Sequence, residues 1–211
     1  LEEQLSESDN FTLAFPDSSE IGFISKIDFK VDNQKVNWRI HSDEPDIAII
    51  ELNKALLPKQ SIEISTPFNV KIPIGSISRL GHNGQQYQIT QWYPKPAVYD
   101  ANGWNAIPYL NQGEFYSEFG TYDVEISLPA NYVLGATGDL QNEKELVWLD
   151  SLSEITANTE TLSKDRSFPK SSSTIKKLRF KAENVHDFAW FCDKRYRVMK
   201  SEVELPHSKR I

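Results

Sequence analysis

Apolar and polar side chains alternate along several short segments of this chain, and that period of two is typical of β-strands. The segment 21–31 shows the pattern best, because Phe23 and Phe29 fall on one face while Lys26 and Lys30 fall on the other. Aromatic and β-branched residues are frequent in these segments, and both kinds suit a pleated surface that is buried on one side. We therefore expect strands rather than helices.

Turn residues separate these alternating segments. Asp32-Asn33 is typical of a tight turn, so we expect 21–31 and 36–40 to pair as antiparallel neighbours. In the second half, 122–128 alternates most regularly and ends at Pro129. Further strands are expected at 46–52, 61–65, 69–74, 86–93, 146–149, 178–182 and 195–205.

Helical periodicity is weak throughout the sequence. No window of about a dozen residues keeps apolar residues at helical spacing between good caps, so substantial helix is not expected. The expected fold class is all-β, a multi-stranded antiparallel two-sheet sandwich or saddle-shaped domain. We expect an amino-terminal lead-in over 1–20, one β domain over 21–205 with a polar excursion at 151–174, and a short link over 206–211.

Charge and apolar content exclude several classes of function. The 211 residues include 23 Lys and Arg against 30 Asp and Glu, a formal charge of −7, with no basic run for binding nucleic acid. Apolar stretches such as 47–50 are far shorter than the roughly 20 residues that cross a bilayer. The sequence begins at Leu1, so we expect any signal peptide to lie outside it.

Residues that could serve as metal ligands or nucleophiles are few and scattered. His41, His82, His186 and His207 are far apart, and none belongs to a recognised zinc spacing, so we interpret them as ordinary histidines. Cys192 follows an apolar run that would raise its pKa, which predicts a buried, inert thiol. No phosphate-binding loop occurs. We therefore expect neither a catalytic residue nor a metal ligand within this sequence.

Aromatic residues are concentrated between 91 and 123. They alternate with amides and carboxylates, which favours a binding face for a sugar or another domain; a long connection that caps the sheet explains them equally well. Pairing Glu114 with Glu118, or Asp100 with Asp123, as glycosidase carboxylates lacks support, because separation defines such pairs. The aromatic residues are Trp92, Tyr93, Tyr99, Trp104, Tyr109, Phe115, Tyr116, Phe119 and Tyr122.

Several short motifs in a fixed order resemble the amino-terminal domain of bacterial zinc aminopeptidases of the aminopeptidase N (gluzincin) family. The residues of these motifs are most similar to those of the branch common in Bacteroidetes, and the resemblance spans about 21–205. The motifs are Ile77-Ser78-Arg79-Leu80-Gly81-His82, Thr90-Gln91-Trp92-Tyr93-Pro94-Lys95, Gly113-Glu114-Phe115-Tyr116-Ser117-Glu118-Phe119-Gly120, Tyr122-Asp123-Val124, Gly135-Ala136-Thr137-Gly138 and Glu183-Asn184-Val185-His186-Asp187-Phe188-Ala189-Trp190.

This resemblance implies a noncatalytic β domain beside a thermolysin-like catalytic domain of the same polypeptide. In the family, that second domain carries the H-E-x-x-H zinc site and the exopeptidase motif, neither of which is present here. The resemblance implies that this piece alone binds no cofactor and has no turnover, while the parent metallopeptidase uses zinc to hydrolyse peptide substrates. A periplasmic or secreted location is favoured over the cytoplasm.

The resemblance also suggests two substrate-binding residues, Gln91 and Tyr93. A Gln-x-Glu or Gln-x-Gln pattern in the family places its second polar residue near the free amine of the substrate, and Tyr93 stands at that position here. A phenol is a weaker partner for an amine than a carboxylate, although its ring offers a cation–π contact. The departure puts ordinary aminopeptidase specificity in doubt. By the period of two, Gln91 and Tyr93 share one face of their strand with Ile89 behind them, so Tyr93 is equally well explained as a core aromatic.

Two other functions stay open. The aromatic segment from Trp92 to Tyr122 also suits a carbohydrate-binding or adhesion module. Alternatively, the chain is a scaffold whose only task is packing against another domain, in which case a large apolar patch should be exposed on the isolated piece.

Overall fold

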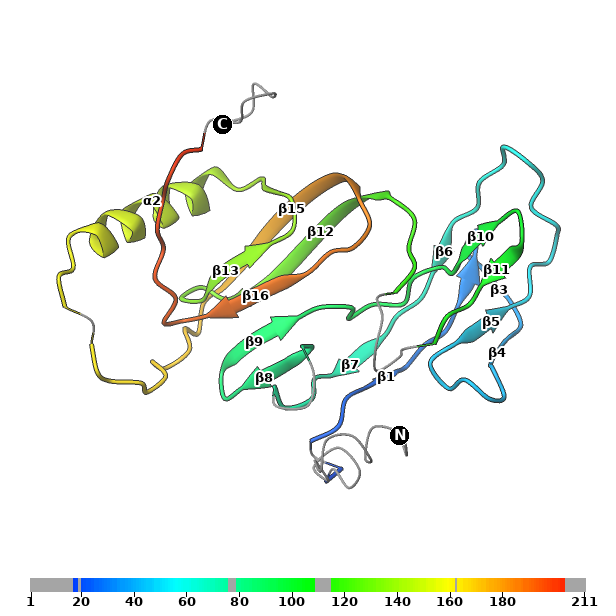
Figure 1. Ribbon diagram of the computed structural model, residues 1–211, viewed down its shortest axis with the longest axis horizontal. Coiled ribbons are helices and arrows are strands. Elements are labelled where there is room, and N and C mark those ends of the chain that lie inside the picture. Colours follow the sequence, from blue (N-terminus) through cyan, green and yellow to red (C-terminus); the bar gives the residue numbers. More distant parts are fainter. Residues whose placement is uncertain (1–16, 19, 76–78, 109–114, 162, 204–211) are drawn as a thin grey trace. The chain divides into compact units, whose positions relative to one another are not determined.

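The protein is built almost wholly from antiparallel β-sheets, which confirms the all-β expectation. The computed structural model describes residues 17–18, 20–75, 79–108, 115–161 and 163–203. The described residues form strands β1 to β16 and one helix, α2 (Figure 1). The chain divides into two compact units, the first made of residues 1–81 and 91–119 and the second of residues 82–90 and 120–211. Both lie mostly within the 21–205 region expected to form the β domain.

Short strands make up the first unit. Its four sheets have the strand orders β1-β7, β3-β2-β6, β4-β5 and β10-β11, and every pairing is antiparallel. No strand in this set exceeds three residues. The strands are β1 (Phe23–Ser25), β2 (Lys30–Val31), β3 (Gln34–Lys35), β4 (Trp38–Ile40), β5 (Ala48–Ile50), β6 (Ile64–Ser65), β7 (Asn69–Lys71), β10 (Val98–Asp100) and β11 (Gly103–Asn105).

The strand expected over 21–31 is interrupted. Lys26 has a left-handed φ of 59°, so β1 ends beside it and pairs with β7, whereas β2 pairs with β3 and β6. The turn after β2 is confirmed: Asp32 and Asn33 have φ values of 48° and 63°, as a primed hairpin turn requires. Beyond the turn, however, β4 pairs with β5 and does not extend the hairpin.

Little apolar surface is buried inside the first unit. Phe29 and Val98 are its buried hydrophobic side chains among the described residues, and Phe29 meets the ring of Trp38 edge to face at 5.4 Å. Many large apolar side chains are exposed instead. They are Ile21, Phe23, Ile24, Ile40, Leu52, Leu56, Leu57, Ile64, Tyr99, Trp104, Ile107, Tyr116 and Phe119.

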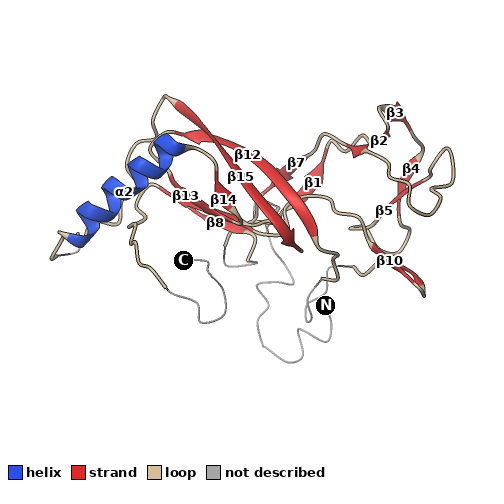
Figure 2. Ribbon diagram, turned by 90° about the horizontal axis from the view of Figure 1, so that it is seen from above, coloured by secondary structure: helices blue, strands red, loops and turns tan. Residues whose placement is uncertain are grey.

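Two larger sheets make up the second unit. One has the order β12-β15-β14 and contains two long strands that lie side by side (Figure 2), and the other has the order β13-β16-β9-β8. The expected strand at 122–128 is confirmed within β12, and the one at 178–182 within β15. The strands are β8 (Gly81–Asn83), β9 (Gln86–Ile89), β12 (Gly120–Pro129), β13 (Val133–Ala136), β14 (Asp139–Leu140), β15 (Ile175–Val185) and β16 (Trp190–Asp193).

Alternation along β12 and β15 separates a buried face from a charged one. Val124 lies opposite Phe180 and Ile126 opposite Leu178, and these side chains face the interior. On the other face, Asp123 and Glu125 form ion pairs with cations of β15. The buried hydrophobic residues of this unit are Ile89, Ile126, Leu128, Tyr132, Val133, Leu134, Leu178, Phe180, Ala182, Phe188 and Cys192.

A helix occupies the place of the strand expected at 146–149, which is therefore wrong. Helix α2 (Glu143–Ala157) buries Glu145, whose carboxylate pairs with the ammonium of Lys176. The same ammonium donates to the Tyr132 carbonyl at 2.6 Å and lies 4.1 Å from the centroid of the Trp148 ring. The helix is thus anchored by a buried ion pair, while its apolar residues Leu146, Val147 and Ile155 are exposed.

Two other expectations concern the segments around α2. The polar excursion expected at 151–174 is helical as far as Ala157, and its remaining described residues form neither helix nor strand. The strand expected at 195–205 is absent from the described residues 195–203. That segment runs beside α2 (Figure 1), where Arg197 donates to the Thr156 carbonyl and Lys200 pairs with Asp150. The contacts of Arg197 and Lys200 are therefore made to the helix and not to a sheet.

Candidate functional site

Gln91 lies just beyond the end of β9, at a sharp change of backbone direction. The strand ends at Ile89, and Gln91 has a left-handed φ of 49°. The expectation that 86–93 forms one strand, with Gln91 and Tyr93 on the same face as Ile89, is therefore wrong. Left-handed backbone at a residue other than glycine is uncommon and costs about 1 kcal/mol or more, and such positions cluster at functional sites.

The side chain of Gln91 adds a second unusual feature. Its Oε1 atom is buried and has no hydrogen-bond partner among the described residues. A buried amide oxygen without a donor costs about 1–3 kcal/mol, so native structures seldom keep one without a reason. Gln91 therefore holds a hydrogen-bond acceptor that a donor from outside the described residues could satisfy after a small side-chain rotation.

Tyr93 belongs to a row of aromatic rings in the first unit. Its ring meets Trp92 edge to face at 5.3 Å, and Trp92 in turn lies 6.0 Å from the ring of Phe68. Tyr93 is half-buried. It is thus neither a fully buried core residue nor a freely exposed one.

An ammonium group lies against this row of rings. The Nζ atom of Lys95 is 5.4 Å from the centroid of the Tyr93 ring and 3.8 Å from that of Phe115. Both distances are within the range in which a cation is attracted to the negative face of an aromatic ring. The rings of Tyr93 and Phe115 therefore already accept a primary ammonium, supplied by the same segment of the chain.

A separate pair of aromatic rings stands on the β10–β11 hairpin. Tyr99 and Trp104 are directly opposite in the register, their centroids are 4.9 Å apart, and they are 66% and 70% exposed. The polar groups beside them serve the hairpin itself: Asp100 accepts from the Asn102 backbone N–H, and the Asn105 amide donates to the Val98 carbonyl. The hairpin thus presents aromatic surface on a polar frame that is already hydrogen-bonded.

Two of the carboxylates considered as members of glycosidase pairs, Asp123 and Asp100, are bound by groups of their own unit. Asp123 accepts two hydrogen bonds from Arg179, at 2.6 and 2.5 Å, which hold the pKa of Asp123 below its ordinary value. Asp100 belongs to the other unit and is bound within its hairpin turn. Glu118 is exposed, and Glu114 lies outside the described residues.

The histidines and the cysteine have local structural surroundings. Nδ1 of His41 accepts from the Asp43 backbone N–H, and Nδ1 of His82 lies 3.2 Å from the Gly84 carbonyl oxygen. The described residues contain no group of three or more potential metal ligands, and His207 lies outside them. Burial, reinforced by the charge of Asp193, raises the pKa of Cys192 to about 12, which confirms the expected burial of this thiol.

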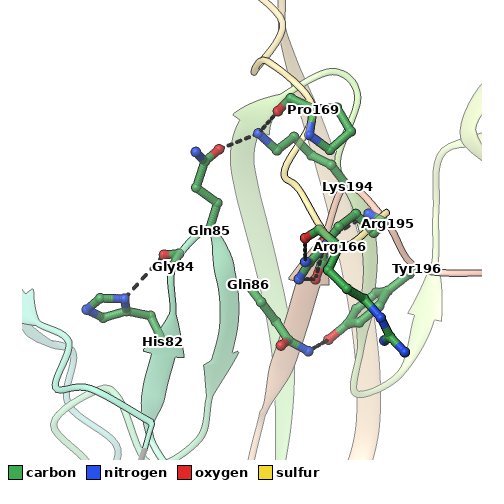
Figure 3. A network of polar contacts seen from close by, with 10 residues as sticks. His82, Gly84, Gln85, Gln86, Arg166, Pro169, Lys194, Arg195 and Tyr196 are labelled. Atoms are coloured by element: carbon green, nitrogen blue, oxygen red, sulfur yellow. Dashed lines mark hydrogen bonds and ion pairs between the residues drawn. The ribbon is translucent and has the colours of Figure 1, made fainter. Parts of the chain in front are cut away.

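A network of polar contacts joins three loops of the second unit (Figure 3). Lys194 donates to the Gln85 side chain and the Pro169 carbonyl, while Arg195 donates to Asp193 and, at 2.6 Å, to the Arg166 carbonyl. Sequence reasoning missed this network because its members are distant along the chain. They hold one another in place, so we interpret them as structural.

The position of Gly84 supports that interpretation. It has a left-handed φ of 60°, and a Cβ atom there would come within 2.6 Å of the Phe168 ring. The guanidinium of Arg195 covers the same ring, at 3.5 Å from its centroid. Glycine is therefore required where the β8–β9 turn meets this loop.

Comparisons with protein-family models, with curated proteins and with solved structures gave no match to this chain. Within the described residues, no helix is both long enough and apolar enough to span a membrane. The function must therefore be argued from the residues themselves and from the resemblance given above.

Proposed function

We propose that this chain is a noncatalytic amino-terminal domain of a zinc metallo-aminopeptidase. In this proposal it packs beside the catalytic domain of the same polypeptide and helps to form the pocket for the amino terminus of a peptide substrate. Zinc and its activated water belong to that other domain. The observation that carries the proposal is the primary ammonium of Lys95 against the rings of Tyr93 and Phe115.

The chemistry of a peptide amino terminus matches this local environment. Its charged group is an ammonium, which aromatic faces attract and amide oxygens accept as a hydrogen-bond donor. Tyr93 supplies a ring that already accepts such a group, and Gln91 supplies an amide oxygen with no donor among the described residues. Lys95 would have to share or leave the Tyr93 ring when substrate binds, which would lower affinity for a free amine.

The exposed apolar residues of the first unit support the packing role. Phe23, Leu57 and Phe119 are each more than half exposed, and many others accompany them. Exposed apolar surface on such a scale is typical of a face that another domain covers. A scaffold that only packs would expose the same residues, so the substrate-binding role needs its own test.

The test uses the parent polypeptide. The coding sequence after Ile211 should contain H-E-x-x-H, and the purified protein should hydrolyse alanine p-nitroanilide, whereas residues 1–211 alone should not. Gln91→Ala should raise KM about tenfold and change kcat little, because the substrate loses one hydrogen bond to a charged group. Gln34→Ala, an exposed glutamine on β3, is the matched control and should leave KM unchanged.

Three results would contradict the proposal. One is the absence of H-E-x-x-H after Ile211, and another is turnover by residues 1–211 with zinc of their own. The third is an unchanged KM in the Gln91→Ala protein, which would leave only the packing role.

A second candidate function, a carbohydrate-binding or adhesion module, is favoured by the exposed rings of Tyr99 and Trp104. Such rings can stack on the apolar faces of sugars. Binding on a glycan array that is lost in Trp104→Ala and kept in Phe119→Ala, which is equally exposed, would support it. Silence on every glycan would count against it.

A further inference from the structure

The strand β12 has one edge without a partner strand. It pairs with β15 along one side, and among the described strands none pairs with its other side (Figure 2). β12 spans ten residues, and at about 3.4 Å per residue its edge is long enough to bind an extended peptide. An open edge offers backbone N–H and C=O groups that favour pairing with another strand.

Features that protect an open edge from pairing occur only at the two ends of β12, where the register shifts between Gly120 and Tyr122 and the strand ends at Pro129. Proteins usually guard an open edge with lysine, proline or a bulge within the strand. Residues 121–128 contain neither Lys nor Pro, and the register with β15 is regular from Tyr122 to Pro129. The edge is therefore able to accept a further strand over most of its length.

The buried face of the sheet is incomplete beside this edge. On β15, Leu178 and Phe180 are 2% and 4% exposed, whereas Val124, directly opposite Phe180, is only half-buried. Farther along β12, Ile126 is buried, at 7% exposure. A strand added at the open edge would cover Val124 and so complete this face.

Charge on β12 argues against a second copy of this chain as the occupant. In an antiparallel pair, opposite residues point to the same face, so two copies related by a two-fold axis must place one residue opposite its own copy. The two registers that pair the most residues are centred on Val124 and on Glu125. The first places Asp123 opposite Glu125, and the second places Glu125 opposite itself. Like charges directly opposite each other destabilise a pair of strands.

Strand β15, which already pairs with β12, places basic side chains beside the acidic residues of β12. On β15, Arg179 pairs with Asp123, and Lys177 pairs with Glu125 at 2.8 Å. The side chains of Asp123 and Glu125 remain 44% and 52% exposed, so solvent still reaches their oxygens. Cations on a strand at the other edge could therefore share these carboxylates.

We propose that the open edge of β12 binds an extended segment of another polypeptide in which apolar and basic residues alternate. The basic residues lie opposite Asp123 and Glu125, and an apolar residue covers Val124. Backbone hydrogen bonds supply affinity, while the acidic residues select the sequence. The inference is independent of the proposed aminopeptidase role, because it concerns the second unit and neither Gln91 nor Tyr93.

The test measures fluorescence anisotropy of labelled peptides with the whole chain. A peptide of alternating Lys and Val should bind, and its Glu and Val counterpart should not. Glu125→Lys should weaken binding about tenfold, because it places a like charge opposite the peptide. The matched control is Lys177→Ser, which removes the same ion pair but keeps the acid at the edge, and it should bind as the unaltered chain does.

Two further measurements keep the proposal falsifiable if a variant fails to fold. Binding to the unaltered chain should weaken about tenfold between about 50 and 500 mM salt, and hydrogen exchange should slow within 123–127. Equal binding of both peptides, salt-independent binding, or protection elsewhere would overturn the proposal. Self-association of the chain with protection over 123–127 would also overturn it, since the occupant would then be a second copy.

Discussion

The two units bury very different amounts of apolar surface. In the second, two long strands and five shorter ones form two sheets, and Ile89 and Phe188 are its largest fully buried side chains. In the first, Phe29 and Val98 are the buried hydrophobic residues among those described, and aromatic rings such as Trp104 face the solvent. The second unit thus stabilises itself, whereas the first presents apolar surface that a partner can cover.

Strand length explains this difference. A strand buries every second side chain, so the ten residues of β12 and the eleven of β15 contribute a continuous apolar face. The strands of the first unit have two or three residues, and each contributes one or two side chains. Left-handed residues such as Lys26 redirect the chain before a longer face can form.

Truncating a buried phenylalanine in each unit tests the contrast. Phe188→Ala removes a ring that is 1% exposed and should lower the free energy of unfolding by about 3–5 kcal/mol. Phe29→Ala, at 6% exposure, should cost less, because among the described residues its unit buries only one other hydrophobic side chain, Val98. Urea unfolding followed by labelling of Cys192, the only cysteine, reports on the second unit. Equal losses would contradict the contrast.

Helix α2 offers a second test, within the stable unit. Lys176→Met leaves the buried Glu145 without its cation and should cost about 3 kcal/mol, chiefly by detaching the helix. The double variant Glu145→Met, Lys176→Met should recover most of that loss, since no uncompensated charge remains. Circular dichroism at 222 nm and urea unfolding measure both. If the single variant keeps its helix, the ion pair does not anchor it.

Acid should weaken the second unit through Asp193. Burial alone would raise the pKa of Asp193, but hydrogen bonds from Arg195 outweigh it, so this pKa lies below the ordinary value. A carboxyl group of this kind stabilises the fold above the pKa of the unfolded chain, about 3.9. That stability is lost as the pH falls through the lower, folded pKa.

The corresponding variant is Asp193→Asn. It should cost about 2 kcal/mol at neutral pH and flatten the decline of unfolding free energy below about pH 4. Asp150→Asn is the control, because the ion pair of Asp150 with Lys200 is exposed. An unchanged acid dependence in Asp193→Asn would show that other carboxyl groups cause the decline.

The smallest effect is expected on the exposed hairpin. Trp104→Ala should cost less than about 1 kcal/mol, because the ring is 70% exposed and loses mainly its cross-strand contact with Tyr99. Thermal unfolding measures the change. A larger loss would mean that the hairpin belongs to the core of the first unit and is not a contact surface.

The sequence predicts the parts of this fold that follow from local pattern. Alternation over 122–128 predicts most of β12, and Asp32-Asn33 predicts the turn after β2. The helix could not be predicted, because the pairing of Glu145 with Lys176 joins residues far apart in the chain. The same holds for Arg195 and Phe168.

The candidate site shows a similar limit. The resemblance of the motifs selects Gln91 and Tyr93. Alternation with a period of two predicts that both lie on the same strand as Ile89, but that strand ends at Ile89. The left-handed backbone of Gln91 and the ammonium of Lys95 beside Tyr93 depend on tertiary packing, which no local pattern reveals. Sequence reasoning therefore selects candidate residues but does not predict their geometry.

Hydrogen–deuterium exchange along the whole chain compares the two units directly. Amides of β12, β15, β9 and β16 should exchange slowest, at rates set by global unfolding, while those of β1, β7, β10 and β11 should exchange much faster through local opening. If the strands of the first unit were protected as strongly as β15, the first unit would be stable without a partner, and the contrast drawn between the two units would be wrong.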